Sequence, residues 1–179
     1  DRSVSRGLGD VYKRQDVENA RGENLTNGDL VGTKDGSAYG LVFDPQDENV
    51  FYFSNNDKHC IYKYDLRTKE WACWAGQEGK SGYLDGPIGQ AMFNKPGQMC
   101  VDSEGNIILT DTENHCIRKI TMSTGYVSTL AGKPQNSGYV NGSAEDAQFK
   151  KPLGICIDND DVMYIGDSEN RAIRRLAVE

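Results

Sequence analysis

The chain has 179 residues, a net charge of −7 and a hydrophobic content of 37%. This length is enough for one domain with a sizeable core, and the acidic balance argues against binding to a nucleic-acid backbone. No window is long and apolar enough to predict a transmembrane helix, and no stretch has the pattern of a signal peptide. The 20 glycines, spread among short apolar runs, indicate the many turns of an all-β domain.

The N-terminal residues differ from the rest of the chain. Residues 1–15 (DRSVSRGLGDVYKRQ) resemble a translated adapter sequence and are set aside from the fold prediction. The alternative is a genuine disordered N-terminus. Residues 16–36 are polar and weakly patterned, as expected for a linker or for the remnant of a preceding repeat.

From residue 37 onward the sequence repeats itself. Ile61, Ile117 and Ile173 are each 56 positions apart, and Pro96 and Pro152 keep the same offset. A fixed period of this length indicates one supersecondary unit built several times.

Each copy reads as short strands separated by turn residues. The expected strands of the first copy cover 40–44, 50–54, 61–64 and 71–75. Those of the second cover 98–102, 107–110, 116–120 and 126–130, and a long loop then leads to the third copy. The third copy ends with its third strand, at 172–178.

Four antiparallel strands per repeat predict a β-propeller. Neighbouring blades must cover one another, which explains why apolar positions recur in register. A β-solenoid is the weaker alternative, because its rungs are shorter and more uniform. The expected domains are blade 1 at 37–94, blade 2 at 95–150 and a partial blade 3 at 151–179. About two and a half blades make an open arc, so N-terminal blades would be needed for ring closure.

The repeats resemble the NHL repeat, whose pattern places Asp-x-x-Asn-x-x-Ile-Arg after the second strand. The resemblance rests on NKPGQMCVDSEGNIILTDTENHCIRKI (94–120) and KPLGICIDNDDVMYIGDSENRAIRRL (151–176). It identifies the repeat residues as Asp111, Asn114, Arg118, Asp167, Asn170 and Arg174. The first copy departs from the pattern, with Asn55 and Tyr62 in place of Asp and Arg, and the second has Gln98 where the third has Gly154.

The GYxDG…AxF insert is further similar to propellers fused to IPT/TIG immunoglobulin-like domains in surface proteins of gut Bacteroidetes. That resemblance implies an exported protein, placed outside the cell or in the cell envelope.

Two kinds of repeated polar residue are candidates for function or for structure. Asp111 and Asp167 begin turns that Asp and Asn side chains cap by bonding to their own backbone, although such turns also lie at a propeller rim where a ligand can bind. Arg118 and Arg174 recur within a strand and favour ion pairing within or between blades over a ring around the channel.

The candidate binding residues lie in loops and in the two histidines of the chain. Tyr83, Asp85, Tyr139 and Asn141 occupy Gly-Tyr-x-(Asp/Asn)-Gly loops, where a tyrosine can stack on a sugar or anchor a protein. The alternative is a loop folded back over a blade edge. His59 and His115 are repeat equivalents, and the alternative to a ligand role is packing between blades.

The five cysteines include no CxxC or metal-ligand spacing and are expected to be small buried hydrophobic residues. We therefore expect no cofactor and no metal from these residues, and no insertion of this segment into a membrane. The resulting hypothesis is a non-catalytic module that binds a protein or glycan through rim loops. A fragment of a metal-dependent propeller lyase or lactonase is the alternative. An RNA-binding NHL domain is a second alternative that the acidic charge opposes.

Overall fold

The computed structural model describes residues 36–177. By its internal contacts the chain divides into two units, and the second, Asp35–Glu179, contains these residues. Residues 1–15 and nearly all of 16–36, for which the sequence predicts non-native and linker segments, lie outside the described part. Within residues 36–177, no helix is long or apolar enough to cross a membrane.

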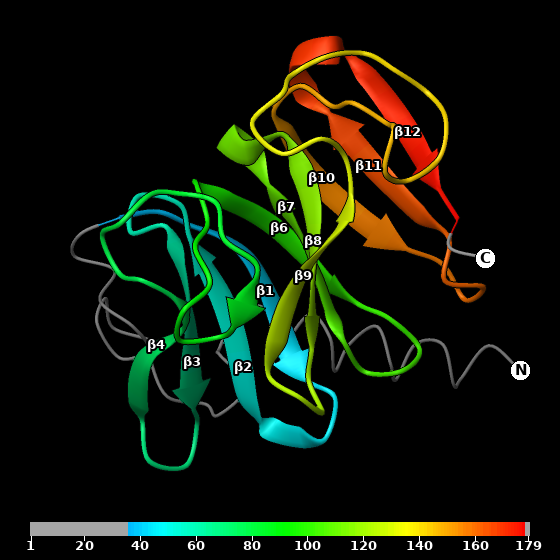
Figure 1. The fold of residues 1–179 in the computed structure, drawn as a ribbon. Helices are drawn as coiled ribbons and strands as arrows, with labels where there is room; N and C mark the ends of the chain where they lie inside the picture. The colour runs from blue at the N-terminus through cyan, green and yellow to red at the C-terminus, as the bar shows by residue number, and fades with distance from the viewer. Residues whose placement is uncertain (1–35, 178–179) are drawn as a thin grey trace, which may run out of the picture. The chain divides into compact units, whose positions relative to one another are not determined.

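Three antiparallel sheets follow one another along the chain (Figure 1). Blade 1 contains β1 (Ala38–Asp44), β2 (Asp47–Asn55), β3 (Cys60–Asp65) and β4 (Glu70–Gly76). Blade 2 contains β5 (Gly86–Pro87), β6 (Pro96–Val101), β7 (Ile107–Asp111), β8 (Cys116–Thr121) and β9 (Tyr126–Ala131). Blade 3 contains β10 (Pro152–Ile157), β11 (Met163–Asp167) and β12 (Ala172–Leu176).

Two single-turn 3₁₀ helices follow the second strand in blades 2 and 3. They are η1 (Thr112–Asn114) and η2 (Ser168–Asn170). Each ends at a residue in the left-handed conformation, His115 or Arg171, with φ of 58° and 53°. The all-β propeller fold is confirmed as three open blades, and no closed ring is formed within residues 36–177.

Strand β6 of blade 2 lies between strand β1 of blade 1 and strand β10 of blade 3 and contacts both. These strands approach closely at Gly40, where an added Cβ would lie 2.8 Å from the carbonyl oxygen of Gly97. Any larger residue would push the two strands apart, so glycine is required there.

Blade 2 is buried on both faces, which explains the continuous apolar run of β7. Ile107 and Leu109 face blade 1, in a cluster that includes Val50 and Tyr52. Ile108 faces the other way, into a cluster with residues of β10, β11 and β12. Each apolar residue of β7 therefore has a neighbouring blade to pack against.

Hydroxyl groups join the blades at repeat-equivalent positions. Ser54 Oγ donates to the carbonyl oxygen of Gly97 at 2.6 Å. Thr110 Oγ1, which lies 56 positions later, donates to the carbonyl oxygen of Leu153 at 2.9 Å. Both hydroxyls are buried, so these bonds also satisfy strand carbonyls that face the neighbouring blade.

The segment that contains β5 belongs to blade 2, although the expected boundaries place it in blade 1. The loop after β4, which the sequence assigns to blade 1, contributes β5 to the sheet of blade 2. Gly86 and Pro87 pair there with Val127 and Tyr126 of β9. The long loop therefore leaves blade 1 early and runs along the outer edge of the next blade.

Candidate functional site

A buried carboxylate organises the rim of blade 2. Asp111 ends β7 with its side chain fully buried. It accepts three hydrogen bonds, from the backbone N–H of Asn94 at 2.8 Å, from Asn114 Nδ2 at 2.8 Å and from Arg118 NH1 at 2.6 Å. The turn of η1 brings Asn114 back toward Asp111, and the β7–β8 hairpin brings Arg118 opposite it. The carboxylate therefore ties two strands and the incoming loop together.

Arg118 extends this network to the loop. It is fully buried, and its NH2 donates to Leu84 O at 2.9 Å and to Asp85 Oδ1 at 2.7 Å. Its guanidinium lies between two aromatic rings, 4.8 Å from the centroid of Tyr83 and 5.1 Å from that of Phe93. A guanidinium suits this position because its plane can stack on rings while its edge donates several hydrogen bonds.

The residues Asp85, Asp111, Asn114, Arg118 and Tyr83 are called the blade-2 clamp below. Burial raises the pKa of the Asp111 carboxyl to about 6, and the charge of Arg118 opposes that shift. Burial acts to lower the pKa of Arg118, but the charges of Asp111 and Asp85 outweigh it and raise that pKa overall. The arginine therefore stays charged in the core.

Blade 3 repeats this arrangement at the same offset. Asp167 accepts from the backbone N–H of Lys150 at 2.7 Å, from Asn170 Nδ2 at 2.8 Å and from Arg174 NH1 at 2.8 Å. Arg174 NH2 donates to Asn141 Oδ1 at 2.7 Å, and the guanidinium lies 4.8 Å from the centroid of Tyr139. Asp167, Asn170, Arg174, Asn141 and Tyr139 form the blade-3 clamp.

The loops that close the two clamps are themselves short hairpins. Leu84 pairs with Met92, and Val140 pairs with Gln148. In each loop the tyrosine and the following Asp or Asn turn inward to the arginine, whereas Leu84 and Val140 are 46% and 42% exposed. The inner side of each loop thus serves the clamp and the outer side is free to meet another molecule.

The two tyrosines differ in exposure because the outer strands differ. Tyr83 OH lies 2.7 Å from Thr129 Oγ1 of β9, so it is covered by that strand of blade 2. Among the described residues β12 is an edge strand, and Tyr139 is 61% exposed. Tyr139 is therefore the candidate binding residue with the most accessible ring, while Tyr83, Asp85 and Asn141 hold the loops.

The histidines lie at the joints between blades. His59 Nδ1 accepts from the backbone N–H of Lys95 at 3.1 Å, and His115 Nδ1 accepts from that of Lys151 at 3.2 Å. Both histidines have left-handed backbones. Burial, reinforced by the charge of Lys95, lowers the pKa of His59. In residues 36–177 no group of three His, Cys, Asp or Glu side chains is placed to hold a metal.

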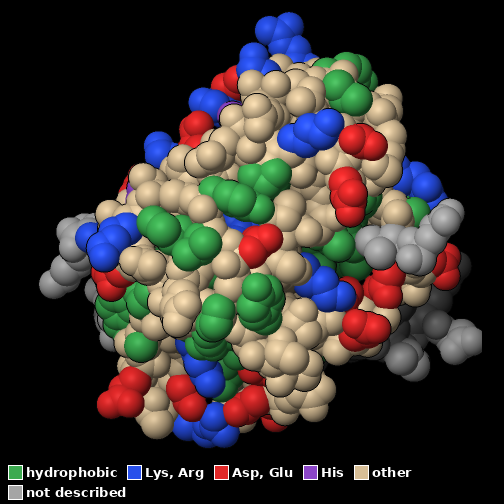
Figure 2. All heavy atoms as spheres, viewed as in Figure 1, with side chains coloured by type: hydrophobic (Ala, Val, Ile, Leu, Met, Phe, Trp, Pro, Cys, Tyr) green, Lys and Arg blue, Asp and Glu red, His purple; other side chains and the backbone are tan. Residues whose placement is uncertain are grey.

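Charged side chains surround these joints. Lys151 Nζ lies 3.2 Å from Glu113 of blade 2 and 3.2 Å from Glu169 of blade 3. Figure 2 shows Lys, Arg, Asp, Glu and His side chains alternating along the upper left margin of this face. Both signs of charge are present, so this rim is no uniform anion-binding surface.

Blade 1 has no such clamp among its described residues. Asn55 replaces the aspartate and accepts from the backbone N–H of Lys58 at 3.0 Å. Tyr62 replaces the arginine and stacks on Phe53, with ring centroids 5.2 Å apart. Trp71 meets Tyr62 edge to face at 4.9 Å. Aromatic packing therefore occupies the position that an ion pair fills elsewhere.

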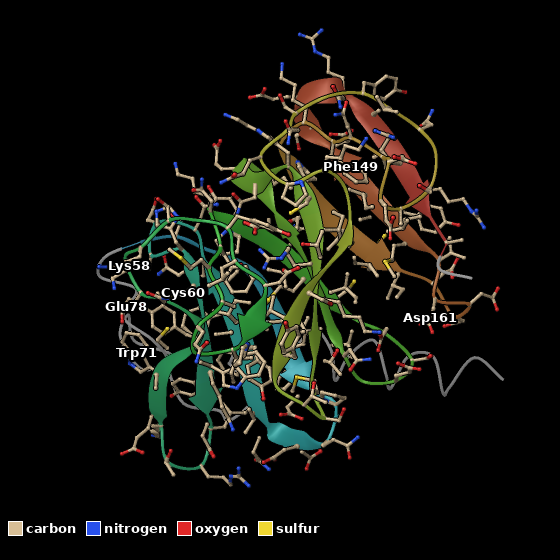
Figure 3. The ribbon with its side chains drawn as sticks, in the orientation of Figure 1. Lys58, Cys60, Trp71, Glu78, Phe149 and Asp161 are labelled. Carbon is tan, nitrogen blue, oxygen red and sulfur yellow. The ribbon has the colours of Figure 1, made fainter. Side chains whose placement is uncertain are left out.

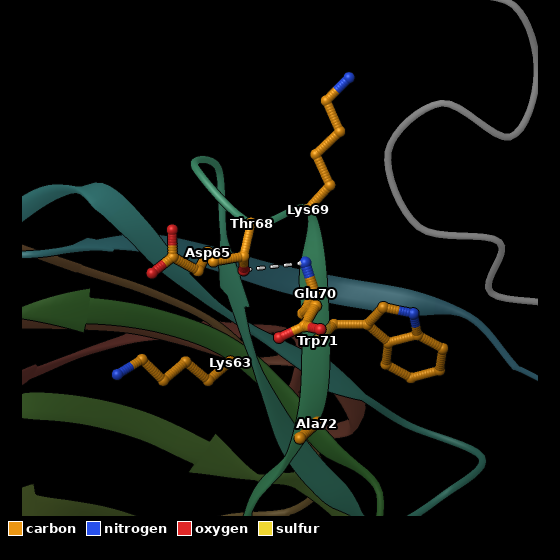
Figure 4. A pocket seen from close by; sticks show the side chains of 7 residues that line it. All are labelled: Lys63, Asp65, Thr68, Lys69, Glu70, Trp71 and Ala72. Carbon is orange, nitrogen blue, oxygen red and sulfur yellow. Dashed lines mark hydrogen bonds between the residues drawn. The ribbon is translucent and has the colours of Figure 1, made fainter.

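An open groove of about 630 Å³ runs along the outer edge of blade 1 (Figure 4). Lys63, Glu70 and the 45% exposed Trp71 are among the residues that line it. It lies at the β3–β4 turn, the opposite end of that hairpin from Cys60 and Gly76. The groove is therefore distinct from the clamps and joints at the rim.

Sequence reasoning missed several residues of this site. Thr129, Ser54 and Thr110 act through hydroxyl groups, and a hydroxyl by itself does not signal a contact. Ser54 and Thr110 share the 56-residue offset, which could have marked them as a repeated interblade contact. Thr129 aligns with Cys73, so no repeat signal identifies it.

Comparison with known proteins supports this architecture. Residues 93–120 match the family model of the NHL repeat. The chain is similar to a protein from Bacteroides thetaiotaomicron described as an auxiliary nutrient binding protein, with 32% identity and a TM-score of 0.67 over 76% of this chain and 36% of that one. A protein of unknown function from the same organism gives 32% identity and a TM-score of 0.74, over 87% of this chain and 38% of that one.

A curated relative is NHL repeat-containing protein 2 of Gallus gallus, which is 30% identical over 84% of this chain. The chain spans 19% of that relative's length. Together these findings define the class: the chain forms β-propeller blades of the NHL-repeat type. Its structural likeness to the Bacteroides proteins agrees with the expected likeness to propellers of gut Bacteroidetes.

Proposed function

We propose that this chain is part of a non-catalytic NHL-repeat propeller that binds a glycan or protein ligand through its rim loops at the bacterial cell surface. The observation that carries the proposal is the two-sided build of those loops. Buried arginines hold the inner side, and Leu84 and Val140 stand exposed on the outer side. Tyr139 stacks on Arg174 and is still 61% exposed. A surface that is rigid on its inner side loses little conformational entropy when it binds a ligand.

The chemistry of the loops favours a sugar. Tyr139 presents an aromatic face and a hydroxyl, the combination with which an amphipathic ring meets both the apolar and the polar parts of a partner. A similar Bacteroides protein is described as nutrient binding, which supports ligand binding as the role of such a propeller. The chain's net charge of −7 speaks against a nucleic acid.

Glycan-array screening followed by calorimetry on the purified protein tests this proposal. Tyr139→Ala is expected to weaken binding about tenfold or more, because a stacked aromatic anchor is lost. Tyr126→Ala is the matched control, since Tyr126 is 47% exposed but is the first residue of β9 and lies outside the rim loops. Its affinity should remain within about twofold of the wild type.

Equal affinities for wild type, Tyr139→Ala and a Leu84→Ser/Val140→Ser double variant would show that the ligand does not bind through the rim loops. Binding to a protein but to no glycan would retain the surface and change the ligand class. Turnover of a bound glycan would overturn the non-catalytic assignment.

A further inference from the structure

Two of the five cysteines lie on neighbouring strands of the same hairpin. Cys60 begins β3 and Cys73 lies within β4. The register pairs Cys60 with Gly76 and Tyr62 with Cys73, with a bulge between these two pairs. Cys73 is therefore the diagonal neighbour of Cys60 on the same sheet face as Tyr62, and the bulge alters the local twist that sets their separation.

The thiols of Cys60 and Cys73 lie close enough for each to shift the pKa of the other, and the Cys73 thiol also donates to Gly76 O at 3.7 Å. Cys60 is fully buried, whereas Cys73 is partly exposed. Figure 3 labels Cys60 and Glu78 in this end of blade 1, and the charge of Glu78 acts on both thiols. The Cys73 thiol is thus accessible to solvent, whereas the Cys60 thiol is shielded from it.

The pair is peculiar to blade 1. The repeat equivalent of Cys60 is Cys116, but the residue equivalent to Cys73 is Thr129, whose hydroxyl serves the blade-2 clamp. Blade 1 has Asn55 and Tyr62 in place of the clamp's ion pair. Cys73 therefore lies where blade 2 uses hydrogen bonds from Thr129 to the Asp85 carboxylate to hold the second half of the hairpin.

We propose that Cys60 and Cys73 form a reversible disulfide that joins β3 to β4 in blade 1. The oxidant is a disulfide compound, such as oxidised glutathione or an exposed disulfide of an oxidoreductase. The cross-link closes a short loop and so restricts the unfolded chain, which stabilises the hairpin. Such bonds persist in oxidising compartments and are rare in the cytosol.

The reaction proceeds by two exchanges. The Cys73 thiol loses its proton, and the thiolate attacks one sulfur of the oxidant. The S–S bond of the oxidant breaks as the mixed disulfide forms, and the first thiol leaves as a thiolate that then takes up a proton. The Cys60 thiolate then attacks the Cys73 sulfur and releases the second thiol. Two protein thiols and one disulfide become one protein disulfide and two free thiols, so atoms and electrons balance.

The ionisation of the pair fits this order. The interaction with the Cys60 thiol lowers the pKa of Cys73, and the same interaction together with burial raises the pKa of Cys60. The thiolate forms first on the partly exposed Cys73, which is the one that an oxidant can reach.

Mass spectrometry of the purified protein after equilibration in a glutathione buffer tests the proposal. Free thiols are alkylated before digestion with trypsin. The expected product joins peptide 59–63 to peptide 70–80, while Cys100, Cys116 and Cys156 are alkylated. Reduction with dithiothreitol should lower the melting temperature by roughly 5 °C.

The variant Cys73→Ser should abolish both the linked peptide and the effect of dithiothreitol on melting. Cys156→Ser is the matched control, because Cys156 is exposed and lies in blade 3, and it should change neither. A wild type in which all five thiols are alkylated after oxidation would contradict the proposal. So would a link between Cys100 and Cys156 in place of one between Cys60 and Cys73, or Cys73 bound to glutathione with Cys60 still free.

Discussion

Blades 1 and 2 fill the same repeat position with opposite chemistry. In blade 2 a fully buried Arg118 is held between Asp111 and Asp85 and between two aromatic rings. In blade 1 the equivalent Tyr62 packs between Phe53 and Trp71. Both arrangements fix the strand that follows the rim turn, one through charge and the other through aromatic packing.

The difference has consequences for how each blade tolerates change. A buried ion pair contributes little net stability relative to apolar packing, but the loss of one partner leaves an unpaired charge in the core. An aromatic cluster loses only the contacts of the ring that is removed. The clamp is therefore more sensitive to the loss of one side chain than the aromatic cluster is.

The largest effect is expected when the carboxylate of the clamp is removed. Asp111→Ala leaves Arg118 buried with only the partly exposed Asp85 as counter-charge, and should lower the free energy of unfolding by about 3–5 kcal/mol. Asn55→Ala, its counterpart in blade 1, loses one hydrogen bond and should cost about 1 kcal/mol. Urea unfolding followed by circular dichroism measures both.

Equal losses for Asp111→Ala and Asn55→Ala would show that the clamp carboxylate is no more important to its blade than the amide that replaces it in blade 1. Fluorescence would be a poor probe here, because both tryptophans, Trp71 and Trp74, lie in blade 1. Hydrogen exchange of β7 and β8 would localise the loss to blade 2.

A transplant of the blade-1 residues into blade 2 gives a smaller and more diagnostic effect. Arg118→Tyr alone leaves Asp111 buried without its cation and should be strongly destabilising. Adding Asp111→Asn removes that charge, so the double variant should recover at least about 1 kcal/mol relative to Arg118→Tyr. A double-mutant cycle in urea measures the coupling, and strictly additive losses would mean that the pair does not act as a unit.

The sequence predicts the blades well because they repeat. The 56-residue offset places strands β6 to β9 of blade 2 and β10 to β12 of blade 3 within two residues of their observed positions, but it does not predict β5. It also predicts ion pairing of Arg118 and Arg174 within or between blades, and turn capping by Asp111 and Asp167, whose side chains instead make no cap hydrogen bond and bind the arginines. The structure shows that each pair lies within one blade.

What the sequence does not predict are contacts without a repeat or across the chain. The Cys60–Cys73 pair depends on a bulge in β4 that shifts the register. The histidine joints depend on backbone N–H groups 36 residues away, and a main-chain donor has no sequence signature. The placement of β5 in blade 2 depends on how the loop turns, which residue composition alone does not determine.

The smallest effect is expected at the one position where the clamps of blades 2 and 3 differ, Asp85 in blade 2 and Asn141 in blade 3. Asp85 accepts from Arg118 and from the backbone N–H of Thr129, whereas Asn141 accepts from Arg174 through a neutral amide oxygen. Asp85→Asn should cost about 1 kcal/mol, because a charge-assisted bond becomes a neutral one and the amide N–H₂ faces donors.

The reverse exchange, Asn141→Asp, gives Arg174 a second carboxylate and should leave the free energy of unfolding unchanged or raise it by about 0.5 kcal/mol. Urea unfolding at low and high salt measures both variants, and salt should reduce the gain at the more exposed Asn141 site. If Asp85→Asn proved neutral, the second carboxylate would add nothing to the clamp. The loop would then be held by Arg118 bonding to Leu84 O and stacking on Tyr83, the same two contacts that blade 3 makes with Val140 and Tyr139.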